Sequence, residues 1–136
     1  MTPPSPRPAP APHRRLAAAL ADLHRALLNA QSTGSPAASN PYALLQAVLH
    51  DPAYGWLRAF SDLILRIDEA GAKGATPSPT AMQGFLSTAM HLVEGGDPAL
   101  AESHAKLQGF LLRPEVAAKN AALRATVEDL RRSVAH

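Results

Sequence analysis

Six histidines and no cysteine limit the chemistry open to this 136-residue chain. His104 stands out because it lies between Leu100 and Leu107, at the position that a 4-3 apolar spacing assigns to a buried helix face. An imidazole inside a helical bundle can bind a metal ion or a small ligand, and His24 on another predicted helix could share that site. The position also suits a structural histidine that bonds to a backbone carbonyl while Ser103 shares the face. Both interpretations stay open.

Asn120 is a second polar residue within an apolar pattern, since it lies between Val116 and Leu123. A buried asparagine in such a seam lowers stability but can fix helix register or oligomeric state. A C-terminal helix of this kind is suited to pairing with its twin across a two-fold axis, and we expect a homodimer. The alternative is that Asn120 lies in an exposed turn.

A third group of polar residues lies on the helix predicted after Trp56. Its apolar side repeats the 4-3-4 spacing, and its polar side carries residues three or four apart. The polar residues are Arg58, Asp62, Arg66 and Glu69, with Ser61 and Asp68 beside them. We expect a ladder of ion pairs, and exposed pairs contribute only about 0–1 kcal/mol each. A solvated face explains this pattern, whereas a partner-facing version of it would be a recognition site.

Motifs of known enzymes and metal sites are absent from the sequence. No glutamate lies three residues before a histidine, as di-iron bundles require, and no His-x-x-x-His pair occurs. Nucleophile-elbow, phosphate-loop and dinucleotide patterns are missing too. We therefore expect a non-enzymatic protein without a cofactor that acts through protein contacts. The alternative is a bundle that binds a small ligand or metal ion at His104. An enzyme would require the Arg58–Glu69 face to line a deep pocket.

The composition is typical of an all-α protein. Alanine and leucine are frequent, β-branched residues are scarce, and no alternating pattern predicts a strand. The hydrophobic fraction is 46%, but much of it is alanine, which buries little area. The core should therefore be modest. A modest core favours self-association, because a second copy would bury more apolar surface.

Prolines, glycines and capping residues divide the chain into predicted helices. Helices are predicted over 12–30 and 80–94, and others should begin at Pro41, Pro52, Pro98 and Pro114. The helix after Pro41 should bury an apolar face of Leu44, Leu45, Val48 and Leu49. Whether Pro114 kinks one long helix or separates two stays open. The sequence predicts a four- or five-helix bundle over residues 13–136 as one domain, after a disordered proline-rich tail over residues 1–12.

Charge and hydropathy lead us to expect neither a nucleic acid nor a membrane as a partner. The net charge is +2, and both signs are interspersed along the helices without the basic stripe of a nucleic-acid-binding protein. No apolar stretch approaches the ~20 residues of a membrane span. The absence of cysteine fits a reducing compartment, and we expect a cytoplasmic protein.

The segment from His50 to Glu69 carries a recognisable string of residues. It reads His-Asp-Pro at 50–52, Trp-Leu-Arg at 56–58, Ser at 61, Leu-Ile at 63–64 and Ile-Asp-Glu at 67–69. This string resembles one that recurs in small uncharacterised bacterial proteins predicted to be helical, although Ala59 replaces a proline and the C-terminal half has no counterpart. The resemblance implies a bacterial source and a compact fold around this segment, and it implies no activity. If the resemblance holds, the candidate functional residues to mutate first are Trp56, Arg58, Ser61, Asp68 and Glu69.

Overall fold

The computed structural model describes residues 10–134, and every regular element in that range is helical. The α-helices are α1 (Pro12–Ser32), α2 (Pro41–His50), α3 (Arg58–Ala70), α4 (Pro79–Glu94), α5 (Ala101–Phe110) and α6 (Pro114–Val134). Short 3-10 helices connect them: η1 (Pro36–Ser39), η2 (Pro52–Leu57), η3 (Ala72–Gly74) and η4 (Pro98–Leu100). The all-α prediction is confirmed. Pro114 separates two helices.

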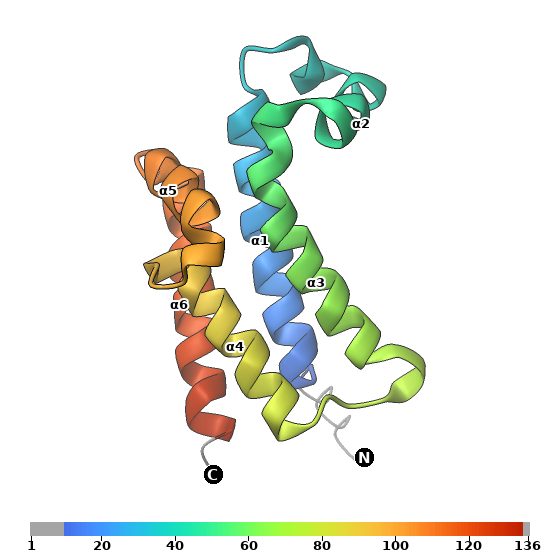
Figure 1. Cartoon of the computed structure of the whole chain (residues 1–136), viewed down its shortest axis with the longest axis vertical. Helices are drawn as coiled ribbons and strands as arrows, with labels where there is room; N and C mark the ends of the chain where they lie inside the picture. The colour runs from blue at the N-terminus through green and yellow to red at the C-terminus, as the bar shows by residue number, and fades with distance from the viewer. Residues whose placement is uncertain (1–9, 135–136) are drawn as a thin grey trace, which may run out of the picture.

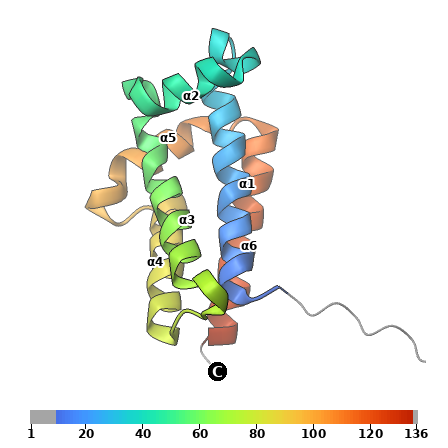
Figure 2. The same cartoon turned by 90° about the vertical axis from the view of Figure 1, so that its right-hand side faces the viewer.

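Four long helices, α1, α3, α4 and α6, run along the long axis of the molecule (Figure 1). Helix α2 lies across one end of α1 and α3, and both termini of the described chain lie toward the opposite end (Figure 2). The predicted count of four or five helices is wrong, because the described residues form six. Each of the six lies in a segment whose start the sequence predicted, but the starts predicted at Pro52 and Pro98 are occupied by η2 and η4, so that α3 and α5 begin later, at Arg58 and Ala101.

Prolines and capping side chains set the helix starts. Seven of the ten described helical elements begin with proline, whose fixed φ suits the first helical position and whose missing N–H would have no partner there. The residue before the proline often provides the cap. Asn40 Oδ1, for example, accepts hydrogen bonds from the backbone N–H groups of Tyr42 (3.0 Å) and Ala43 (3.3 Å). Asp51, Ser78 and Asp97 cap η2, α4 and η4 in the same way.

The core lies between the four long helices. Helix α1 packs mainly against α6 and α3, while α4 packs against α6 and α5. The inward positions of α1 are Leu16, Leu20, Leu23 and Leu27, and each is fully buried. The C-terminal seam is equally closed, since Val116, Leu123, Val127 and Leu130 are at most 1% exposed. This single chain therefore already covers the face that the sequence suggested for pairing with a twin; the side chain of Val134 is outside the described part.

Helix α2 differs from the other helices because none of its residues is buried. Leu44 and Val48 are half-buried and pack against the core, as predicted. Leu45 and Leu49 were expected on the same face, but they are 53% and 56% exposed. The reason is geometric: residues 44 and 48 lie one turn apart on the inward side, whereas residues 45 and 49 are rotated by about 100° from them.

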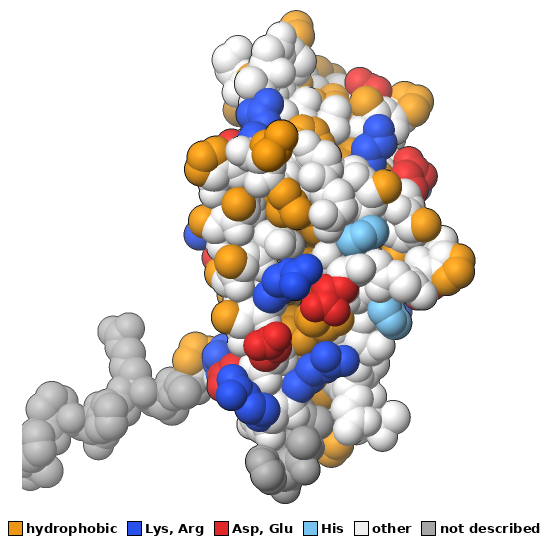
Figure 3. All heavy atoms as spheres, turned by 90° about the vertical axis from the view of Figure 1, so that its left-hand side faces the viewer, with side chains coloured by type: hydrophobic (Ala, Val, Ile, Leu, Met, Phe, Trp, Pro, Cys, Tyr) orange, Lys and Arg blue, Asp and Glu red, His pale blue; other side chains and the backbone are white. Residues whose placement is uncertain are grey.

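The outer surface is charged along α6. Figure 3 shows the face on which α5 and α6 lie, where side chains of both signs gather over the lower half. Two ion pairs connect α6 to its neighbours, from Arg124 to Glu94 (3.3 Å) and from Asp129 to Arg15 (2.9 Å). Among the described helices, none is both long enough and apolar enough to cross a membrane. Most of the predicted tail, residues 1–9, lies outside the described residues.

Candidate functional site

A groove forms where α2 crosses the end of α1 and α3. Its lining combines apolar side chains from α2 and η2 with polar side chains from α1 and α3. The lining residues are His24, Val48, Leu49, Tyr54, Leu57, Arg58, Ser61 and Asp62. The structure therefore brings together three of the predicted α3 residues and the histidine that the sequence had placed with His104.

The groove is small and polar on one side only. Its cavity volume is about 220 Å³, which is less than the roughly 300–1,000 Å³ of sites that enclose a ligand. His24 is partly buried, and this desolvation lowers the pKa of its imidazole from the ordinary value of 6.5. The Ser61 hydroxyl donates a hydrogen bond to the carbonyl oxygen of Arg58 (3.1 Å). The deep pocket that an enzyme on this face would require is not formed by this groove.

The remaining polar residues of α3 lie outside the groove. Arg66 and Glu69 are exposed, and Asp68 lines a different hollow at the other end of the helix. The expected ladder of ion pairs is absent from the described residues, whose ion pairs are Arg15–Asp129, Glu94–Arg124 and Arg113–Glu115. The helical spacing predicted the shared face correctly. Because holding long exposed side chains together costs entropy, this spacing permits ion pairs without requiring them.

Trp56 belongs to the core and not to the surface site. It is 3% exposed, and its ring stacks on Phe110 at 5.8 Å while meeting Phe60 edge-on at 6.2 Å. Its indole N–H donates a hydrogen bond to Gln31 Oε1 (3.2 Å), and its backbone carbonyl accepts one from the buried Ser103 hydroxyl (2.7 Å). These contacts fix η2, from which Tyr54 and Leu57 reach the groove.

His104 occupies a half-buried position at the edge of α5, and Ser103 takes the buried one. The spacing from Leu100 to Leu107 had assigned His104 to the buried face of one helix. That assignment is wrong, because Leu100 belongs to the 3-10 helix η4 and not to α5. His104 Nδ1 lies 3.1 Å from the carbonyl oxygen of Leu92, so this nitrogen donates the bond. The ring also lies against Gly95, whose φ of +85° favours glycine and where a Cβ would lie only 3.0 Å from the His104 ring. This is the structural histidine that the sequence left open as one interpretation.

His104 and His24 have different surroundings, because His24 lines the groove beneath α2 and His104 does not. No cluster of three or more histidine, aspartate or glutamate side chains within residues 10–134 could hold a metal ion. A metal centre built from these two histidines therefore has no third described ligand.

Asn120 is buried, with 8% of its surface exposed, and so does not lie in an exposed turn, which was the other interpretation of its position. Its Oδ1 atom is fully covered and accepts no hydrogen bond from any described residue. The surrounding positions of α6 are packed within the chain, so Asn120 does not lie on an open face.

His13 is a residue that the sequence reasoning missed. It is 7% exposed and lines hollows at the start of α1. The signal was available: the leucine seam of α1 runs at positions 16, 20, 23 and 27, and one step of three residues toward the N-terminus reaches position 13.

Comparison with family models, with curated proteins and with solved structures finds no match to this chain. The resemblance of residues 50–69 to bacterial helical proteins accordingly stays a prediction.

Proposed function

We propose that this protein is a non-enzymatic helical domain that acts through protein contacts, and that its contact surface comprises the outer stripe of α2 and the adjoining groove. The outer stripe is Tyr42, Leu45 and Leu49, which are 71%, 53% and 56% exposed. Their spacing of three and four residues places them on one side of α2. This exposed stripe is the observation on which the proposal depends.

The stripe is unusual because α2 is apolar on both sides. Six of its ten residues are alanine, leucine or valine, and the inward side already uses Leu44 and Val48. A helix that is apolar all round is normally covered all round. Contiguous exposed apolar surface in a folded domain marks a contact site. A partner that covered the outer side of α2 would remove this mismatch.

We infer that the partner is a second copy of this chain. A two-fold interface places the same surface on both sides, so it must be complementary to itself. Arg58 and Asp62 are opposite charges on one groove, both exposed and neither in an ion pair within the described residues. Two-fold pairing would set Arg58 against Asp62 of the partner subunit, while the uncharged stripe of α2 meets its own copy.

The expected dimer is weak. Helix α2 has ten residues and is therefore about 15 Å long, so the stripe and groove provide an interface at the small end of the known range. Interfaces that bury less than about 1,200 Å² in total belong to transient complexes. The monomer and dimer should accordingly exchange, with the dimer favoured as concentration rises.

Sedimentation velocity between about 5 and about 500 µM tests the proposal, since a weak dimer gains mass across such a range. Leu49→Glu should leave a folded monomer at every concentration. The matched control is Leu112→Glu, which introduces the same charge at a 96% exposed leucine on the α5–α6 turn and should dimerise normally. A strict monomer in the unmodified protein, or equal loss of dimer in both variants, contradicts the proposal.

A charge exchange tests the arrangement of the two copies. Arg58→Asp and Asp62→Arg should each weaken association, because each creates like charges across the two-fold axis. The double variant restores both pairs with reversed sign and should recover the dimer. Failure of the double variant to recover would show that Arg58 and Asp62 do not face each other.

A further inference from the structure

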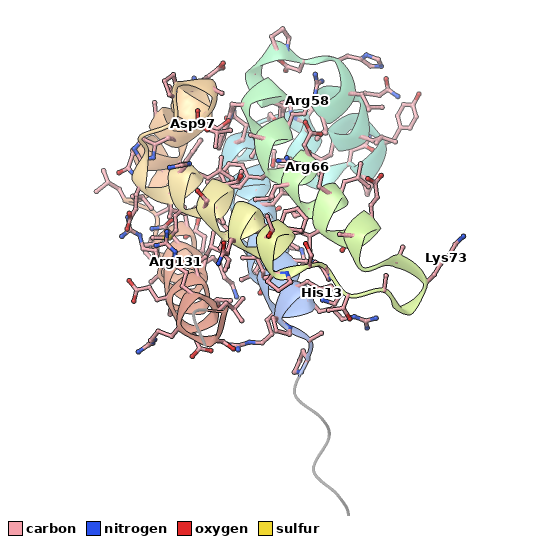
Figure 4. All side chains as sticks on the ribbon, turned by 60° about the horizontal axis from the view of Figure 1, so that its bottom comes forward. His13, Arg58, Arg66, Lys73, Asp97 and Arg131 are labelled. Atoms are coloured by element: carbon pink, nitrogen blue, oxygen red, sulfur yellow. The ribbon has the colours of Figure 1, made fainter. Side chains whose placement is uncertain are left out.

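The end of the bundle where α1 begins contains adjoining hollows, each lined by His13. One has a volume of about 260 Å³ and apolar walls that include Pro12, Pro77 and Met82. Another, of about 300 Å³, is lined by His13 with Arg14, Asp68 and Gly71. Figure 4 shows His13 beside the chain that connects α3 to α4, away from Arg58 and the groove. A polar hollow and an apolar hollow thus meet at one imidazole.

His13 is closely packed, and its ring makes no hydrogen bond to any residue that the structure describes. Its side chain is 7% exposed, and none of the hydrogen bonds among described residues includes its ring. A Cβ on Gly71 would lie 2.5 Å from His13 Nε2, so the ring packs directly on the Gly71 backbone. Asn120 Oδ1 is the one fully covered side-chain N or O atom of the described residues that lacks a partner. The His13 nitrogens therefore keep some accessible surface, and because His13 lines both hollows, a ligand there can accept a hydrogen bond from the ring N–H.

The electrostatic setting at this end favours an anion. Helix α1 has 21 residues, no side-chain cap at Ala11 and no acidic residue in its first turn. The partial positive charge of its N-terminus therefore has no counter-charge on the helix itself. Arg14 adds a full positive charge at the rim, and Asp68 adds one negative charge on the facing helix α3. With one fixed charge of each sign, the site suits a singly charged anion better than a doubly charged one.

We propose that this end of the bundle binds an apolar monocarboxylate. The carboxylate accepts hydrogen bonds from the His13 ring and the Arg14 guanidinium, and its apolar body enters the hollow lined by Pro12, Pro77 and Met82. Asp68 repels a dianion such as phosphate and so contributes selectivity. This site uses no residue of the dimer surface, and it stands or falls independently of the proposed function.

Benzoate is the probe, with NMR of the histidine ring signals and calorimetry as readouts. Benzoate should bind with a Kd on the order of 1 mM, as expected for a ligand of its size. Benzamide, which lacks the charge, and acetate, which lacks the ring, should each bind at least about tenfold weaker. Benzamide binding as tightly as benzoate, or no response of any histidine to benzoate, overturns the proposal.

Variants at exposed positions keep the test independent of folding. Arg14→Gln should weaken benzoate binding by about tenfold, which is the loss of one charge-assisted bond. Arg25→Gln removes the same charge from an exposed position farther along α1 and should leave binding unchanged. Asp68→Asn should tighten benzoate binding several-fold and allow phosphate to bind. Equal affinities in Arg14→Gln and Arg25→Gln, or weaker binding in Asp68→Asn, would also refute the site.

Discussion

Helices α6 and α2 carry apolar stripes of the same kind, yet the fold treats them in opposite ways. The α6 stripe is at most 1% exposed along Val116, Leu123, Val127 and Leu130. The outer α2 stripe is more than half exposed at each of its three residues. The difference arises from position: α6 lies between α1 and α4, whereas α2 crosses the end of the bundle and meets other elements on one side only. An apolar stripe therefore indicates that a surface needs covering but not which chain covers it.

The largest effect that distinguishes the two helices should come from truncating one leucine in each. Leu123→Ala should lower the free energy of unfolding by about 2–5 kcal/mol, because it removes fully buried methyl groups and leaves a cavity. Leu49→Ala should lower it by less than about 1 kcal/mol, since that side chain is already largely in water. Urea unfolding at low protein concentration measures both. Similar losses in the two variants would show that α2 is as well packed as α6.

A smaller effect should follow from the single flaw in the α6 seam. Asn120→Leu removes a buried oxygen that has no described hydrogen-bond partner, and should raise the free energy of unfolding by about 1 kcal/mol. Asn120→Ala removes the same oxygen without adding volume, and serves as the control for overpacking. Thermal and urea unfolding would report the change. If both variants are clearly less stable than the unmodified protein, Asn120 makes a stabilising interaction. This position would then not distinguish α6 from α2.

The smallest effect concerns His24 beneath α2. Burial holds the pKa of His24 below 6.5 in the folded protein, so the unfolded chain binds the proton more readily. Stability should fall as the pH drops through 6.5 toward the folded pKa and become level below it. Arg58, Asp62 and Tyr54 also line this groove and stay unchanged in the test.

The measurement compares urea unfolding at about pH 7.5 and about pH 5, on either side of the ordinary histidine pKa. His24→Gln should lose less stability between the two conditions than the unmodified protein. His50→Gln, at an exposed position on α2, should behave like the unmodified protein. An equal loss of stability between the two pH values in all three proteins would show that His24 is exposed to water. Helix α2 would then cover less of the bundle than the structure indicates.

Most of the secondary structure could be predicted because its causes are local. Proline at the first helical position and a capping side chain before it act within four residues, as Asn40 shows at the start of α2. The leucine spacing of α1 likewise reports its inward face directly. The predicted starts at Pro52 and Pro98 differ from the structure, because each proline begins a short 3-10 helix and the α-helix follows only at Arg58 or Ala101.

The candidate site was only partly predictable. Arg58, Ser61 and Asp62 were recognised as one face of a helix, since helical spacing alone places them together. That His24 joins them depends on how α1 packs beside α3, which no local pattern encodes. His104 and Ser103 exchanged roles for a similar reason: a 3-10 helix at Leu100 rotates the face that α5 presents to the core.

The sequence by itself determined the helical class, the helix starts and the leucine faces, because each depends on interactions between residues a few positions apart. Only the tertiary structure decided which faces this chain covers. It closed the α6 seam around Asn120, left the outer side of α2 open, and packed His13 against Gly71 on a distant turn. These outcomes depend on how the long helices pack against one another. Burial is therefore a property of the assembled bundle and not of any one segment.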